Sequence, residues 1–210
     1  GRVSQLNGLK RERPDLVIGV TGCMAQRMGE TLLERAPYVD VVMGPDGYRS
    51  LPQTLASLDK ERAAPAPERP RRRSSRGPQL AVLDLSLGEN YEGLEQRRGE
   101  GPTAWLPIQR GCDHRCTFCI VPYVRGPEKN RAAPEIFHEI RGLVDTGVSE
   151  VTLLGQTVNS YVWGEWDFPR LLREVARIDG IRRVRFTSPH PNDVTPELVE
   201  VMAVEAAVCE

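Results

Sequence analysis

Three of the chain's cysteines fall within eight residues, at Cys112, Cys116 and Cys119. In a helix, spacings of four and three would align the thiols on one face, but the outer sulfurs would lie about 10 Å apart. The polar residues between Cys112 and Cys116, and the glycine and proline that flank the segment, instead predict a loop. Because a loop can wrap three thiolates around one centre, this segment is the first candidate for a metal site.

Two kinds of metal site remain open for these thiols. A structural zinc site is normally closed by four ligands. His114 could be proposed as the fourth, but it is too close to its flanking cysteines to share a tetrahedral ion well, so we interpret it as a solvated loop residue. A [4Fe-4S] cluster takes three thiolates and leaves one iron open for a small chelating ligand. The sequence therefore favours an iron–sulfur cluster, with a non-catalytic zinc-binding module as the alternative.

The composition limits the class of protein. Of the 210 residues, 40% are hydrophobic and 27% are charged, which is typical of a globular chain. A net charge of -1 excludes a chain-wide basic surface but leaves room for a local basic groove. The odd number of cysteines does not suit a disulfide framework and indicates a reducing compartment, so we expect a cytoplasmic protein without a membrane span. The chain starts without Met, and we expect it to be part of a longer protein.

Strands and helices alternate around the cysteine segment. The pattern predicts strands at 105–109, 151–154 and 184–186, and helices at 134–144, 168–178 and, after a Thr195 cap, 196–202. The cysteine loop follows a strand, so it opens at the carboxyl edge of a parallel sheet, where ligand sites lie. Three β-α units in succession predict an α/β fold whose parallel sheet curves into part of a barrel.

Residues 1–58 repeat the alternation on a smaller scale. They predict a helix ended by Pro14, strands at 16–20 and 39–43, and helices at 25–35 and 51–58, which together form a small parallel α/β unit. Residues 59–97 are interpreted as a linker, because much of this stretch is rich in Pro, Ala and Arg without periodicity. Its arginines at 71–73 could contact phosphates, but the absence of aromatic residues near them favours a solvated tether. A second domain is predicted over 98–210.

The cysteine spacing, with Phe118 before the last cysteine, resembles the signature of radical S-adenosylmethionine (SAM) enzymes. In that family the open iron is chelated by the amino and carboxylate groups of SAM, and one electron from the cluster releases a 5′-deoxyadenosyl radical. Such chemistry serves unactivated C–H bonds, which offer no acid–base handle. The resemblance implies a [4Fe-4S] cluster and SAM as cofactors and places Phe118 near the adenine.

Four further stretches resemble the methylthiotransferases, and most closely the MiaB-type tRNA enzymes. They are residues 21–26, 119–123, 153–161 and 186–191. The resemblance implies addition of a methylthio group to C2 of isopentenyladenosine beside the anticodon. It also implies two partners, a tRNA anticodon stem-loop and an electron donor such as flavodoxin or ferredoxin. A threonylcarbamoyladenosine tRNA or a ribosomal protein aspartate remains an alternative substrate.

The same resemblance assigns roles to individual residues. Residues 1–58 would be part of the methylthiotransferase N-terminal domain and 98–210 the first half of the radical SAM core. Cys23 would ligate a second [4Fe-4S] cluster, whose other two cysteines would precede the chain. Gly155 and Gln156 would bind the methionine end of SAM, and Asn159 and Ser188 are weaker candidates for that pocket. A tight turn and a helix cap are the alternative for these four residues.

Two remaining residues receive structural interpretations. His190 lies between two prolines, and Cys209 matches no ligand position.

Overall fold

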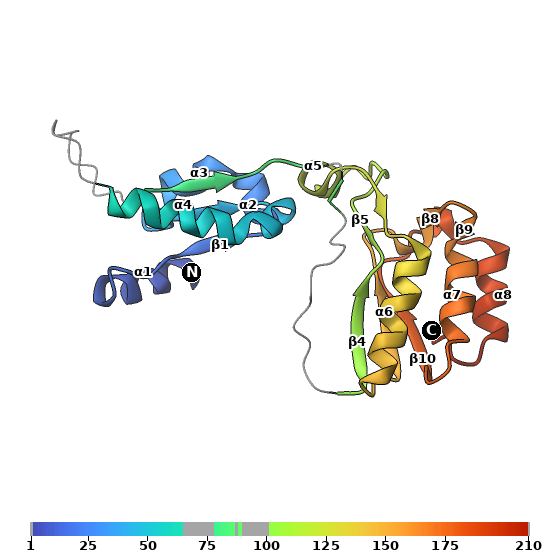
Figure 1. Cartoon of the computed structure of the whole chain (residues 1–210). Coiled ribbons are helices and arrows are strands. Elements are labelled where there is room, and N and C mark those ends of the chain that lie inside the picture. The colour runs from blue at the N-terminus through green and yellow to red at the C-terminus, as the bar shows by residue number, and fades with distance from the viewer. Residues whose placement is uncertain (1, 65–77, 87, 90–100, 210) are drawn as a thin grey trace. The chain divides into compact units, whose positions relative to one another are not determined.

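A computed structural model describes residues 2–64, 78–86, 88–89 and 101–209 of the chain (Figure 1). The chain divides into two compact units, Gly1–Ser86 with Tyr123–Arg125, and Leu87–Pro122 with Gly126–Glu210. Each unit is built on a parallel sheet combined with helices. The predicted α/β fold class is therefore confirmed.

The first unit alternates helices with three short strands. Its elements are α1 (Arg2–Glu12), β1 (Gly19–Thr21), α2 (Cys23–Met28), α3 (Glu30–Arg35), β2 (Val41–Met43), the 3-10 helix η1 (Pro45–Ser50), α4 (Leu51–Ala63) and β3 (Leu80–Val82). The strands pair in parallel in the order β1-β2-β3. The central strand β2 is buried along its whole length, which matches its continuous apolar sequence.

This unit differs from the sequence prediction in several places. The strand expected at 16–20 is the shorter β1, which begins only at Gly19. The single helix expected over 25–35 is two helices, α2 and α3, that meet at Gly29 with φ 53°. Helix α4 continues to Ala63, and the segment Leu80–Val82 of the expected linker pairs with β2. Leu80 and Val82 pack on a small core that includes Leu58, which explains why this segment joins the sheet. The arginines at 71–73 lie outside the described residues.

The second unit contains three β-α repeats with short insertions. Its elements are β4 (Thr103–Pro107), β5 (Gln109–Arg110), β6 (Lys129–Asn130), α6 (Ala133–Asp145), β7 (Glu150–Leu154), η2 (Val158–Ser160), β8 (Val162–Trp163), β9 (Trp166–Asp167), α7 (Phe168–Ala176), β10 (Arg183–Phe186), η3 (Pro191–Asp193) and α8 (Pro196–Val204). Helix α5 (Val121–Arg125) falls at the division between the units. The main sheet has the order β10-β7-β4 and is parallel throughout.

The two faces of this sheet have different surroundings. Ala104, Val151 and Val184 stand in register on one face and are buried in a core with residues of α6, α7 and α8. Trp105 and Arg185 lie on the other face, where a cavity of about 710 Å³ opens and Trp105 is 60% exposed. One covered face and one open face are expected of a sheet that forms part of a barrel wall.

The helix ends follow the predicted chemistry. The Thr195 side chain accepts a hydrogen bond from the Leu198 backbone N–H at 3.2 Å, so the predicted cap of α8 is confirmed. Asp167 caps α7 in the same way through the Arg170 N–H, at 2.9 Å. Across the described residues, every helix is too short or too polar to cross a bilayer.

Candidate metal centre

Three loops leave the second unit's sheet at one edge. The cysteine loop lies beyond β4 and β5, the segment 155–161 follows β7, and the segment 187–193 follows β10. Because the strands are parallel, their carboxyl ends meet at the same edge, where ligand sites collect in open α/β sheets. The residues predicted from separate parts of the sequence are thus brought into one neighbourhood.

The cysteine segment is a loop, as predicted. No helix or strand covers residues 111–120, all of which are described. The Cys112 N–H donates to the Gly126 carbonyl at 3.2 Å, and the Cys119 N–H donates to the Cys116 carbonyl at 3.0 Å. Gly111 adopts φ 75°, and a Cβ there would lie 2.0 Å from the Pro127 carbonyl oxygen. Only glycine can occupy this entry to the loop without moving the backbone.

Three cysteines free of disulfides are the ligand set that a [4Fe-4S] cluster takes. All are free; Cys112 is buried, and Cys116 and Cys119 are half-buried. A zinc ion with Zn–S bonds of about 2.3 Å would draw its sulfurs to within ~4 Å of one another. Among the described residues, no group of three ligand atoms lying within 4.8 Å of one another includes a cysteine. In a cubane each thiolate binds a different iron, so the sulfurs need not converge so closely.

Buried polar groups support the first cysteine from the loop after β7. Thr157 is almost fully buried, and its hydroxyl lies 2.9 Å from the Cys112 sulfur. The Thr157 N–H donates to the side-chain oxygen of Gln109, at 3.0 Å. A Cβ at Gly155 would lie 2.7 Å from that same oxygen, so the glycine permits this approach. The loop ends at Tyr161, whose hydroxyl donates to a backbone carbonyl and whose burial raises its pKa.

The loop after β10 reaches the second cysteine. The His190 Nε2 lies 3.9 Å from the Cys116 sulfur. The His190 ring stacks on His114, with centroids 3.8 Å apart and planes 12° from parallel. The His114 Nε2 in turn lies 2.7 Å from a carboxylate oxygen of Asp193. His114 is therefore not the solvated residue that the sequence suggested, because its ring is fixed on both its face and its edge.

The residues proposed for SAM binding have varied surroundings. The Gln156 side-chain oxygen accepts the Gly111 N–H at 2.7 Å, which ties this residue to the cysteine loop. The buried Asn159 amide bonds the backbone N–H and carbonyl of His190, at 2.7 and 2.9 Å. Ser188 is exposed and is the one described non-glycine residue with a positive φ, at 58°. Phe118 is 93% exposed, so it packs against little of the chain.

Several residues that support the cysteine loop were not predicted from the sequence. Thr157 and Asp193 received no role, and His190 was interpreted as structural only. The available signal was position, because each of these residues follows a strand that ends at the same edge as the cysteine loop. Polar residues in the segments that follow the strands therefore carry the signal for this site.

Of the other two cysteines, one belongs to each unit. Cys23 is half-buried at the first residue of α2 in the first unit. Cys209 lies near the chain end, and its N–H donates to the Val184 carbonyl at 2.9 Å, so it extends the pairing of β10. Its structural interpretation accords with this bond.

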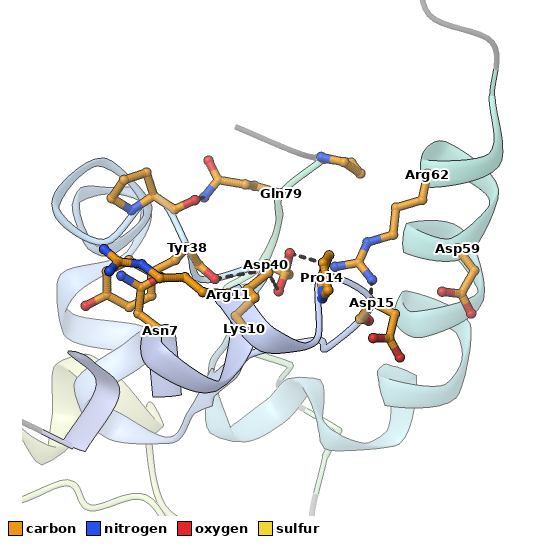
Figure 2. A pocket seen from close by; sticks show the side chains of 12 residues that line it. Asn7, Lys10, Arg11, Pro14, Asp15, Tyr38, Asp40, Asp59, Arg62 and Gln79 are labelled. Atoms are coloured by element: carbon orange, nitrogen blue, oxygen red, sulfur yellow. Dashed lines mark hydrogen bonds and ion pairs between the residues drawn. The ribbon is translucent and has the colours of Figure 1, made fainter. Parts of the chain in front are cut away.

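The first unit has a polar hollow of about 760 Å³, which Figure 2 shows from close by. Its centre is Asp40, which is 4% exposed and bonds Lys10, Arg62 and the Ile18 N–H. A buried carboxylate is tolerated only when it is paired, and these partners tie α1 and α4 to the strand region. The charged groups at the centre of this hollow therefore have a structural explanation.

Comparison with known sequences identifies the class of protein. Residues 106–206 match the Radical SAM superfamily, and residues 1–44 match the family described as Uncharacterized protein family UPF0004. Residues 106–206 of the chain belong to the radical SAM superfamily, and the resemblance carried by the cysteine loop is confirmed.

Three relatives of the chain share the same enzyme name. The chain is 44% identical to a tRNA-2-methylthio-N(6)-dimethylallyladenosine synthase of Carboxydothermus hydrogenoformans, over all of this chain and 45% of the relative. It is 41% identical to the enzymes of that name from Cereibacter sphaeroides and Citrifermentans bemidjiense, over 97% of this chain and 43% and 44% of those relatives. The chain thus spans less than half the length of these relatives.

Proposed function

We propose that the gene product containing this chain is a tRNA methylthiotransferase that adds a methylthio group to C2 of isopentenyladenosine next to the anticodon. The observation that carries the proposal is the 41–44% identity to synthases of that product over nearly the whole chain. The identity extends through both units, so it does not reflect a shared cysteine motif alone. The three strand-end loops supply a site of suitable chemistry.

Cys112, Cys116 and Cys119 would hold the radical [4Fe-4S] cluster. When bound, the cluster and SAM supply a one-electron route to a carbon radical that can take hydrogen from an unactivated C–H bond. The chain's own contribution is to position the loop that carries the three cysteines. Gly111 gives the loop its entry conformation, and Gln156 fastens the loop after β7 to it.

Five residues are proposed to line the SAM pocket: Phe118, Gly155, Gln156, Asn159 and Ser188. The exposed ring of Phe118 is free to cover an adenine, because it packs against little of the chain. Gly155 is buried beside Gln109, and its backbone turns at the carboxyl end of β7. Asn159 would act through His190, since its amide already bonds that residue's backbone.

Cys23 is proposed as one ligand of a second [4Fe-4S] cluster, from which sulfur would be delivered. The partners would be the anticodon stem-loop of tRNA and a one-electron donor such as flavodoxin or ferredoxin. Free thiols and a tRNA substrate both suit the reducing cytoplasm, where we propose that the enzyme works.

The test is a nucleoside assay. The gene product containing this chain is reconstituted anaerobically and incubated with isopentenyladenosine-bearing tRNA, SAM and a reductant, and the digested tRNA is analysed by mass spectrometry. We expect 2-methylthio-isopentenyladenosine from the native protein and from Cys209→Ala, and none from Cys116→Ala. Methylthiolation of threonylcarbamoyladenosine or of a ribosomal protein, with isopentenyladenosine unchanged, would contradict the substrate assignment.

A further inference from the structure

The polar cluster beside the cysteine loop could in principle be a second metal site. His114, His190 and Asp193 offer three ligand atoms that lie within 4.8 Å of one another. However, the two imidazole rings are stacked and nearly parallel. Imidazole lone pairs lie in the ring plane, so two rings stacked face to face cannot both aim a nitrogen at one ion. The arrangement instead fixes the His190 ring in place.

Hydrogen bonding also fixes the tautomer of His190. The Asn192 backbone N–H lies 3.3 Å from His190 Nδ1, and a backbone N–H can only donate. The nearest carboxylate oxygen, of Asp193, lies 4.0 Å from Nδ1, beyond hydrogen-bond distance. Nδ1 is therefore assigned as the acceptor, and the proton of the neutral ring is assigned to Nε2. That nitrogen is the one 3.9 Å from the Cys116 sulfur, at the long end of the range for a sulfur acceptor.

The rest of the loop holds this donor from several sides. Asn159 bonds both backbone polar groups of His190, while His114 covers the ring and is itself bonded to Asp193. His190 thus has little freedom to turn its Nε2–H away from the sulfur.

Thr157 makes the equivalent contact to Cys112. Its hydroxyl is 2.9 Å from the sulfur, and either atom could donate when the cysteine is a thiol. A cysteine that binds iron is a thiolate without a proton, so the hydroxyl must then be the donor. The neighbouring Gln109 holds the Thr157 backbone, which fixes the position of the hydroxyl.

We propose that Thr157 and His190 are positioning residues that each donate one hydrogen bond to a cluster thiolate and thereby raise the cluster's reduction potential. Reduction adds one negative charge to the cluster, so a donor stabilises the reduced form more than the oxidised form. The inference rests on the cluster of the proposed function but not on its tRNA substrate.

The test compares variants that keep or remove each donor. A Gln side chain can place an amide N–H near the position of Nε2, so His190→Gln retains the donor and His190→Leu removes it. Thr157→Ser retains the hydroxyl and Thr157→Val removes it with little change of shape. His138→Leu, on the exposed face of α6, is the matched control for losing a histidine elsewhere.

Each variant of this chain is reconstituted anaerobically, its iron is counted, and its cluster is titrated with dithionite while the electron paramagnetic resonance (EPR) signal is recorded. Removing one donor should shift the reduction equilibrium about tenfold toward the oxidised form. For a one-electron couple, this shift lowers the reduction potential by ~59 mV. The double variant Thr157→Val/His190→Leu should shift about twice as far. Thr157→Ser, His190→Gln and His138→Leu should stay near the native potential.

Equal potentials in the donor-keeping and donor-removing variants, at equal iron content, would overturn the proposal. A donor-removing variant that loses its iron would show that the residue holds the loop rather than tuning the cluster, and would overturn the proposal for that residue. Failure of the proposed substrate is distinguishable, since no tRNA enters the measurement. A chain that binds zinc in place of iron would refute the cluster itself.

Discussion

The cysteine loop and Cys23, which are assigned to two different clusters, have very different surroundings. Around Cys112 and Cys116, loops from two neighbouring strands bring a buried hydroxyl and an imidazole to the sulfurs. Cys23 begins a six-residue helix, and its sulfur accepts one hydrogen bond, from Arg125 Nε at 3.2 Å. It is the only cysteine of the first unit. The difference shows that a parallel sheet gathers support for a ligand loop at one edge. We therefore expect the two positions to respond differently to substitution.

The largest effect is expected at the centre of the cysteine loop. Cys116→Ala removes one of three thiolates, so the reconstituted chain should fall from about four irons to nearly none. Iron and sulfide analysis measures this loss, with Cys209→Ala as the matched cysteine control. A full cluster in Cys116→Ala would contradict the assignment of this loop as the metal site.

A smaller loss of iron is expected when Gly111, at the entry to the cysteine loop, is replaced. Gly111→Ala puts a Cβ against the Pro127 carbonyl and forces an alanine to φ 75°, which alone costs ~1–2 kcal/mol. The backbone must shift, and iron loading should fall below half of the native value. Gly142→Ala is the control, because it lies in α6 with open space around it and should stabilise the chain by about 0.5–1 kcal/mol. Unchanged loading in Gly111→Ala would mean that the entry conformation is not required.

A moderate effect on stability is expected at Asn159, which bonds the loop after β10. Asn159→Ala leaves the backbone N–H and carbonyl of His190 without their side-chain partner, which should lower the free energy of unfolding by about 1–3 kcal/mol. Thermal unfolding measures the change, and the exposed Asn192→Ala should stay within about 0.5 kcal/mol of native. If both variants unfolded at the native temperature, Asn159 would have no fastening role.

The smallest effect is expected at Cys23. Because the first unit of this chain contains no other cysteine, Cys23→Ala should leave the iron content of the 210-residue chain near four. The same analysis used for Cys116→Ala measures it. A loss as large as that of Cys116→Ala would remove the contrast between the two positions.

The sequence predicted what depends on local pattern. The Thr195 cap, the three strands of the second unit and the loop form of the cysteine segment each follow from residues close together in the chain. The strand Leu80–Val82 was missed because it depends on packing within the folded unit. The break at Gly29 was also missed, although a glycine that can adopt φ 53° is a local signal for the end of a helix. Short segments follow their tertiary environment more than their own propensity.

The site was predictable in part for the same reason. Spacing alone identified the cysteine loop, but the contact of Thr157 with Cys112 spans 45 residues and that of His190 with Cys116 spans 74. Such contacts exist only because parallel strands end at one edge, and their side-chain geometry cannot be obtained from spacing. The protonation pattern of His190 likewise requires the position of the Asn192 N–H.

The central claim is that the cysteine loop holds an iron–sulfur cubane, and one measurement addresses it directly. The chain is reconstituted anaerobically with iron and sulfide in the presence of equimolar zinc, and metals, sulfide and the EPR signal after reduction are recorded. We predict about four irons and four sulfides per chain with a signal from a reduced cluster. One zinc per chain, with no sulfide and no iron signal, would contradict the account.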